Sequence, residues 1–457
     1  MVTVKEIITR LNSSSISRRM GQGLAWSFTG TALAKFLTLV VGIICAHILQ
    51  KEAYGEFSMV RSTINMFIVL GSAGLGVTST KYIAEYRVEQ ADKIPAVYAA
   101  TNFFGFLMAV ITAILILLGA PFIANNILHH PSIVLPVRVG AVLLFFSIIN
   151  GVQNGALMGF ENFKAIAINT LSGSILESIL TIFGAYYFGV NGAILGFGMG
   201  FILIFVMNHL SINKNFYVIQ IKKLSIKELQ LKDFSILYTY SLPAALSALL
   251  ITPSFWLIRS ILVRSEGFQD LAVFEAADQW KVIILFIPTA FSQIILPILS
   301  SLNKEKASFV STLKYNMLIV GVTALLLSIG VILFGGFIMR LYGATYDNPV
   351  PVQILAISTI FSALANVLEM AVYSLGKMWQ CFVINIVWAM LMVGCSYYLC
   401  MRGEGANGLS MAVLVSYVVS FLLFLVDTII VVRKEVKRRQ RRLVISYLHS
   451  FFSLPRF

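Results

Sequence analysis

Four basic side chains lie inside or at the edge of long apolar stretches, where charged residues are rare. They are Lys35, Arg61, Arg259 and Lys281. A charge at the centre of a bilayer costs on the order of 2.5–3.5 kcal/mol on insertion scales, so such residues normally face a cavity, a partner or a substrate. Clustered cations stabilise an anion, and the planar fork of arginine matches phosphate oxygens. These residues predict a binding site for a sizeable, amphipathic anion that carries phosphate.

Ion pairing within the protein is the alternative for each of these cations. Asp278 precedes Lys281 by three residues, which is within reach on a helix. Arg61 could pair with Glu56 or extend toward the membrane surface. Lys35 has no acidic residue in its own apolar stretch, which favours the cavity interpretation at that position.

Three carboxylates also fall within apolar stretches: Glu177, Glu369 and Asp427. Such groups could bind a coupling proton or Na⁺, or they could serve as counter-charges for the cations. No further cofactor is expected.

The elements that must position these residues are membrane helices. The 457 residues are 58% hydrophobic and 12% charged, far from the composition of a soluble domain. A span needs about 20 apolar residues. Twelve stretches qualify: 22–48, 56–79, 96–120, 133–157, 165–188, 192–210, 236–258, 270–298, 315–339, 350–373, 379–400 and 407–432. The predicted fold class is all-α and polytopic.

The net charge of +14 comes from lysines and arginines that gather in alternate loops. Only a few lie on the opposite side of the predicted membrane: Lys51, Arg138, Arg259, Arg264, Arg340 and Arg402. Loops rich in Lys and Arg stay in the cytoplasm, so both termini are predicted there. Because the charge is not gathered on a folded domain, no nucleic-acid partner is expected.

The chain divides into two predicted lobes of six spans. We expect a cytoplasmic N-terminal segment (1–21), an N-lobe (22–210), a cytoplasmic linker (211–235), a C-lobe (236–432) and a basic, aromatic cytoplasmic tail (433–457). A shift of 216 residues aligns Asn191-Gly192 with Asn407-Gly408, which indicates a parallel duplication or a chance match. Two pseudo-symmetric bundles around a central cavity follow from the duplication. The tail either lies along the anionic leaflet or only sets the topology.

No motif for catalysis is present. The sequence has no nucleotide-binding glycine loop and no nucleophile elbow. Its four cysteines lie in or at the ends of apolar stretches without metal-ligand spacing, so they are expected to be buried thiols. We therefore expect neither an enzyme nor a metal site.

Several local patterns resemble polysaccharide-biosynthesis flippases, and the similarity in span layout covers nearly the whole chain. The patterns are EAYGEFS at 52–58, GLG at 74–76, KYIA at 81–84, GALMGF at 155–160 and LYG at 341–343. They are similar to Wzx-type O-antigen transporters of the multidrug, oligosaccharidyl-lipid and polysaccharide (MOP) exporter superfamily.

The resemblance implies a multi-pass protein of the bacterial inner membrane with two lobes around a V-shaped cavity. It would move undecaprenyl-pyrophosphate-linked sugar units for O-antigen, capsule or exopolysaccharide to the outer leaflet. The resemblance also implies that three cations lie at positions similar to those of the cations that bind the diphosphate in related lipid II flippases. They are Lys35, Arg61 and Lys281. Membrane lipids and the polysaccharide polymerase machinery are the other expected partners.

Two alternatives remain beside the flippase. A drug or metabolite antiporter of the same superfamily would favour acidic cavity residues, whereas Lys35 and Arg61 are basic. A membrane polymerase or glycosyltransferase would need a sizeable catalytic loop outside the membrane, and no loop of that size is predicted.

Overall fold

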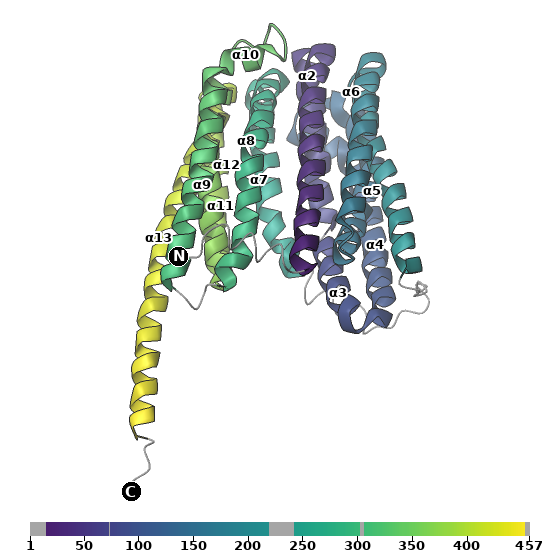
Figure 1. Cartoon of the computed structure of the whole chain (residues 1–457). Helices are drawn as coiled ribbons and strands as arrows, with labels where there is room; N and C mark the ends of the chain where they lie inside the picture. Colours follow the sequence, from purple (N-terminus) through teal and green to yellow (C-terminus); the bar gives the residue numbers. More distant parts are fainter. Residues whose placement is uncertain (1–14, 73, 219–241, 302–305, 453–457) are drawn as a thin grey trace. The chain divides into compact units, whose positions relative to one another are not determined.

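The computed structural model describes residues 15–72, 74–218, 242–301 and 306–452 (Figure 1). The described residues form helices and short connections, without a strand. The α-helices are α2 (Ser15–Ser72), α3 (Leu75–Glu89), α4 (Ile94–Phe122), α5 (Val134–Gly159), α6 (Phe163–Val218), α7 (Leu242–Glu266), α8 (Phe268–Ser301), α9 (Lys306–Leu333), α10 (Gly335–Arg340), α11 (Val350–Ser374), α12 (Met378–Cys400) and α13 (Gly405–Phe452). Three short helices join them: η1 (Ala91–Lys93), η2 (Ile123–Ile127) and η3 (Pro131–Ile133).

The helices confirm the predicted all-α membrane fold. Within the described residues, eight helical segments are long and apolar enough to cross a membrane. Two of these, in α2 and α6, contain a single non-helical residue each, Gln50 and Gly189. Each break falls between two predicted spans, so α2 and α6 hold two spans apiece. Gly189 has a φ of 59°, which glycine adopts without a steric penalty.

A second break interrupts the predicted span 56–79. Helix α2 ends at Ser72 and α3 begins at Leu75, with Gly74 between them at a φ of 69°. This left-handed conformation again suits glycine. The helix is therefore interrupted within an apolar stretch that looked continuous in the sequence.

The chain forms two compact units. Unit 1 comprises 1–279, 339–348 and 400–406, and unit 2 comprises 280–338, 349–399 and 407–457. Helix α7 and the first part of α8 thus belong to unit 1. The predicted lobe boundaries stay a prediction, because residues 219–235 of the expected linker and all residues before 15 lie outside the described part. Helix α13 continues to Phe452, into the predicted tail, whose side chains also lie outside the description.

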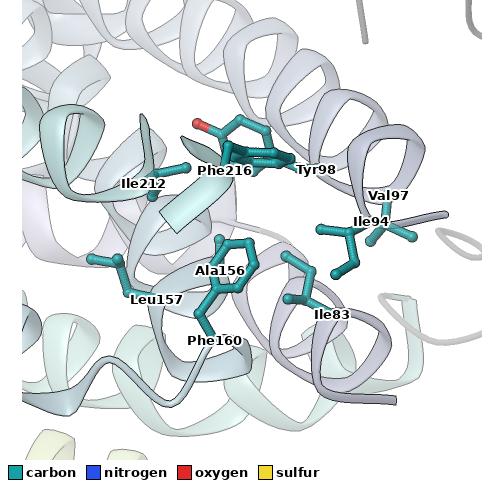
Figure 2. Packing of buried hydrophobic residues seen from close by; sticks show 9 residues of the cluster. All are labelled: Ile83, Ile94, Val97, Tyr98, Ala156, Leu157, Phe160, Ile212 and Phe216. Carbon is teal, nitrogen blue, oxygen red and sulfur yellow. The ribbon is translucent and has the colours of Figure 1, made fainter. Parts of the chain in front are cut away.

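An apolar cluster joins the ends of four helices in unit 1 (Figure 2). Its members come from α3, α4, α5 and α6: Ile83, Ile94, Val97, Tyr98, Ala156, Leu157, Phe160, Ile212 and Phe216. The rings of Tyr98 and Phe216 lie 5.6 Å apart, and Phe160 meets Phe216 edge-on at 5.7 Å. This packing fixes α3 to the α5–α6 pair.

Amide side chains join α5 to both halves of α6. Asn208 Nδ2 donates to Asn154 Oδ1 at 3.0 Å, and Asn208 Oδ1 accepts from Asn169 at 2.9 Å. Both Asn169 and Asn208 are buried. Such hydrogen bonds hold membrane helices together where lipid supplies no hydrophobic drive for association.

Unit 2 is built around the packing of α9 against α11. Ser328 on α9 bonds to the Ala356 carbonyl and to the Thr359 hydroxyl, both at 2.8 Å. A buried apolar cluster accompanies these bonds: Phe309, Leu313, Val320, Ala324, Ala363, Val367 and Ala371.

The crossing of α3 and α5 depends on Gly76. A Cβ atom at this position would lie 2.6 Å from the Gly151 carbonyl oxygen, too close without a helix shift. Gly76→Ala should lower the free energy of unfolding by about 1–3 kcal/mol through overpacking. Unfolding of the purified protein in detergent, followed by circular dichroism, measures the change.

The matched control is Gly119→Ala on α4, where a Cβ atom would meet nothing within 4 Å. This substitution should leave stability unchanged or slightly raised, because alanine favours a helix over glycine. Equal effects of the two substitutions would contradict the close crossing.

Candidate functional site

Helices α2, α7 and α8 bring two arginines and two carboxylates together inside unit 1. Arg61 lies on α2 beyond the break at Gln50, and Arg259 lies on α7. Glu275 and Asp278 are three residues apart on α8, so both carboxylates project from one side of that helix. We call these four residues, Arg61, Arg259, Glu275 and Asp278, the charge cluster.

Arg259 is the centre of the charge cluster. Its Nε donates to Glu275 Oε1, and its Nη2 donates to Asp278 Oδ2 at 3.0 Å. A third donor, Nη1, bonds to the Phe255 carbonyl at 3.1 Å. Phe255 and Phe274 each place a ring 5.6 Å from the guanidinium carbon. Arg259 is thus held by two carboxylates, a carbonyl and two aromatic rings.

Arg61 is held much more loosely. Its Nη2 lies 3.9 Å from Glu275 Oε2, so the two arginines share one carboxylate. Its guanidinium also lies 5.6 Å from the Phe57 ring centre. The Arg61 side chain is 19% exposed, against 10% for Arg259.

Two positive and two negative groups make the charge cluster neutral as a whole. Taking each charge out of water is expensive, and only close pairing with good hydrogen bonds offsets that cost. The cluster therefore stabilises itself and, in this arrangement, is a poor site for an additional anion.

Neutral polar contacts join the same helices beside the charge cluster. Trp256 Nε1 on α7 donates to Thr63 Oγ1 on α2 at 2.9 Å. Gln279 on α8 donates to the Tyr54 hydroxyl at 2.6 Å and accepts from the Tyr342 hydroxyl at 3.1 Å. All five side chains belong to unit 1, where they attach α7 and α8 to α2.

Arg61 and Asp278 have partners on neighbouring helices that spacing within one helix did not suggest. Arg61 approaches Glu275, whereas Glu56 accepts a hydrogen bond from Ser132 at 2.7 Å. Asp278 contacts Arg259 on the neighbouring helix. Uncharged polar residues in spans are too common to stand out in the sequence, so these four residues were not predicted: Tyr54, Trp256, Gln279 and Tyr342. Two of them could have been noticed in the sequence, because Tyr54 falls in the EAYGEFS pattern and Tyr342 falls in the LYG pattern.

The two predicted lysines are not part of the charge cluster. Lys35 lies on α2 and is half-buried, and within the described part of the chain no acidic side chain comes within ion-pair distance of it. Lys281 lies on α8 and is buried, two residues beyond the end of unit 1.

The three predicted carboxylates lie at separate positions. Glu177 on α6 packs against Gly200 and lies within electrostatic range of Arg61. Glu369 on α11 accepts hydrogen bonds from Asn385 at 2.8 Å and Tyr373 at 3.2 Å. Among the described residues, no group of three or more His, Cys, Asp or Glu could hold a metal ion.

Asp427 on α13 lies near Glu369 in unit 2. Both carboxylates are within electrostatic range of the Cys381 thiol on α12. Glu369, Asp427 and the buried Cys381 thus belong to one region of unit 2.

Removal of Arg259 should destabilise the protein strongly. Arg259→Met leaves two buried carboxylates with too little positive charge, so the free energy of unfolding should fall by about 3–5 kcal/mol. Chemical unfolding in detergent measures the loss. Arg264→Met, an exposed arginine one turn further along α7, should change stability by less than about 0.5 kcal/mol.

A triple variant separates charge from packing. Adding Glu275→Gln and Asp278→Asn to Arg259→Met removes the buried negative charge and should recover much of the lost stability. Equal stability of Arg259→Met and Arg264→Met would contradict a buried charge cluster.

Known sequences include a protein family and two relatives that are similar to this chain. The family model described as polysaccharide biosynthesis protein matches residues 20–303. The EPS I polysaccharide export inner membrane protein EpsE of Ralstonia nicotianae is 25% identical over 191 residues, 41% of this chain and 44% of that protein. Its namesake in Ralstonia solanacearum is 25% identical over 182 residues, 39% and 42% of the two chains. The matched stretch thus spans less than half the length of these relatives.

Solved structures share the fold over most of the chain. An inward-facing multidrug resistance MATE family transporter of the MOP superfamily has a TM-score of 0.71 at 18% identity, covering 88% of this chain and 96% of that one. A MOP superfamily transporter from Pyrococcus furiosus has a TM-score of 0.65 at 16% identity, covering 90% and 96%. Such low identity shows the fold alone. The match to residues 20–303, more than half of the sequence, places this chain in the polysaccharide biosynthesis protein family.

Proposed function

We propose that this protein is a flippase that moves an undecaprenyl-pyrophosphate-linked oligosaccharide across the bacterial inner membrane by alternating access. The family and the names of the Ralstonia relatives support export of a polysaccharide precursor. The fold shared with MOP superfamily transporters supports a transport mechanism in place of catalysis. Both termini would lie in the cytoplasm.

The observation that carries the proposal is Lys35. This lysine lies in a membrane-spanning segment of a polysaccharide biosynthesis protein, half-buried and away from any described carboxylate. A cation kept in that setting is stabilised when an anion approaches it. The diphosphate that links such a lipid to its sugars is an anion of this kind.

The four predicted cations have different roles in this proposal. Lys35 binds the diphosphate in unit 1, and Arg61 contributes when its contact with Glu275 is broken; Lys281 is a separate candidate cation in unit 2. Arg259 keeps α7 and α8 together through Glu275 and Asp278 and is a positioning residue.

A cationic drug antiporter is the second reading of the same fold. A cavity for cationic drugs would gain from uncompensated carboxylates, but Glu275 and Asp278 are matched by arginines. Lys35 would repel such a substrate. The observed charges therefore favour an anionic substrate.

Loss of the protein should leave lipid-linked repeat units facing the cytoplasm. In a deletion strain, Lys35→Ala and Lys281→Ala should each restore export less well than the unchanged protein, because each removes a positive charge from the diphosphate path. The accumulated lipid-linked oligosaccharide is extracted and quantified, and Western blotting verifies membrane insertion. Lys314→Ala, an exposed lysine on α9, is the control and should restore export fully.

Two outcomes would contradict the flippase proposal or the roles given to the lysines. The first is a deletion strain that accumulates no lipid-linked units. The second is full export by both lysine variants, which would remove the roles given to these lysines.

The intramembrane carboxylates are the proposed sites of coupling to H⁺ or Na⁺. Glu177→Gln, Glu369→Gln and Asp427→Asn each remove one negative charge with little change in shape. In proteoliposomes with an imposed pH or Na⁺ gradient, at least one variant should lose the gradient-dependent part of transport. Unchanged gradient dependence in all three variants would contradict coupling at these residues.

A further inference from the structure

The two arginines of the charge cluster differ in how much of their bonding capacity is used. Arg259 donates three hydrogen bonds, to Glu275, Asp278 and the Phe255 carbonyl. Arg61 approaches Glu275 at 3.9 Å, beyond hydrogen-bond distance. Within the described part of the chain no hydrogen bond from Arg61 is found. An arginine has five N–H donors, so Arg61 retains nearly all of its capacity.

Glu275 keeps a closer partner when it loses Arg61. Its Oε1 accepts from Arg259, and only its Oε2 faces Arg61. If Arg61 turned away, the carboxylate would keep its better partner and would not become an isolated buried charge. A phosphate oxygen, in turn, offers Arg61 the short bidentate contact that Glu275 does not make.

We propose that Glu275 masks Arg61, and that an anionic phosphate headgroup competes with Glu275 for this arginine. The proposal rests on the proposed function and adds to it a residue that regulates access to the anion site. Without substrate, the charge cluster is neutral and Arg61 is engaged. With substrate, Arg61 transfers to the phosphate while Glu275 stays on Arg259.

The exchange also changes how α8 is attached to α2. Arg61 and Glu275 form the charged contact between these helices, whereas Tyr54 and Gln279 form a neutral one. Phosphate binding at Arg61 removes the charged contact and leaves the neutral one. Since coupling between two equilibria is reciprocal, separation of α8 from α2 must favour phosphate binding to the same extent.

Binding of a short polyprenyl diphosphate to the purified full-length protein tests the exchange. Farnesyl diphosphate is the probe, and isothermal titration in detergent gives its Kd. Glu275→Gln should bind at least about fivefold more tightly than the unchanged protein, because Arg61 loses its competing contact with the Glu275 carboxylate. Adding Arg61→Gln to Glu275→Gln should abolish that gain.

Asp278→Asn is the matched control. It removes a carboxylate from the same cluster, but one that lies against Arg259 and leaves the Arg61–Glu275 contact in place. Its Kd should stay within about twofold of the unchanged protein. A general rise in positive charge would instead tighten binding equally in Asp278→Asn and Glu275→Gln, and that result would overturn the proposal.

The remaining outcomes separate this inference from the proposed function. If the unchanged protein binds the probe and Glu275→Gln binds it with the same Kd, masking is wrong while the diphosphate site stands. If no variant binds the probe, both the masking and the diphosphate site are wrong. Thermal unfolding of each variant verifies the fold, and inorganic pyrophosphate in place of the probe shows whether the headgroup alone suffices.

Discussion

The free energy of keeping charge inside a membrane protein constrains the rest of this structure. Arg259 is buried with two carboxylates around it, and removal of any one of them would leave an uncompensated charge. The requirement for mutual neutralisation brings α7 and the first part of α8 to α2, although their sequences lie far apart. Hydrogen bonds such as Trp256 to Thr63 then add to a contact that the charges already favour. The buried charges thus favour the inclusion of α7 and the first part of α8 in unit 1 with α2.

The same constraint explains why charged residues in this chain have unequal roles. A cation that is surrounded by acceptors, such as Arg259, contributes to structure. A cation with no described carboxylate at ion-pair distance, such as Lys35, is the kind of residue that we propose as a ligand contact. Arg61 lies between these extremes, because it shares Glu275 and forms no close contact with it. The number of acceptors around a buried cation therefore distinguishes a supporting residue from a binding residue.

Much of the fold could be predicted from the sequence, because length and apolar content are local properties. The break at Gly189 lies between the predicted spans 165–188 and 192–210, where a glycine stands between two apolar runs. The partners of the buried charges could not be predicted. Spacing within one helix suggested Lys281 as a partner of Asp278. The contact of Asp278 with Arg259 could not be predicted, because it depends on which face of α8 meets α7. Uncharged partners such as Gln279 were harder to predict, because nothing in the sequence distinguishes them from other polar residues in the spans.

The break at Gly74 lies between two helices that share part of their packing. On one side, α2 carries Arg61 and the contacts to α7 and α8; on the other, α3 is packed into the apolar cluster with α4, α5 and α6. A glycine in the left-handed region can change its dihedral angles with little steric resistance. Gly71 in the last turn of α2 also packs closely on α4 and α5, since a Cβ atom there would lie 2.8 Å from Thr112 Oγ1 and closer still to Ile148 Cδ1. The backbone is discontinuous at this joint, whereas the packing around it is not.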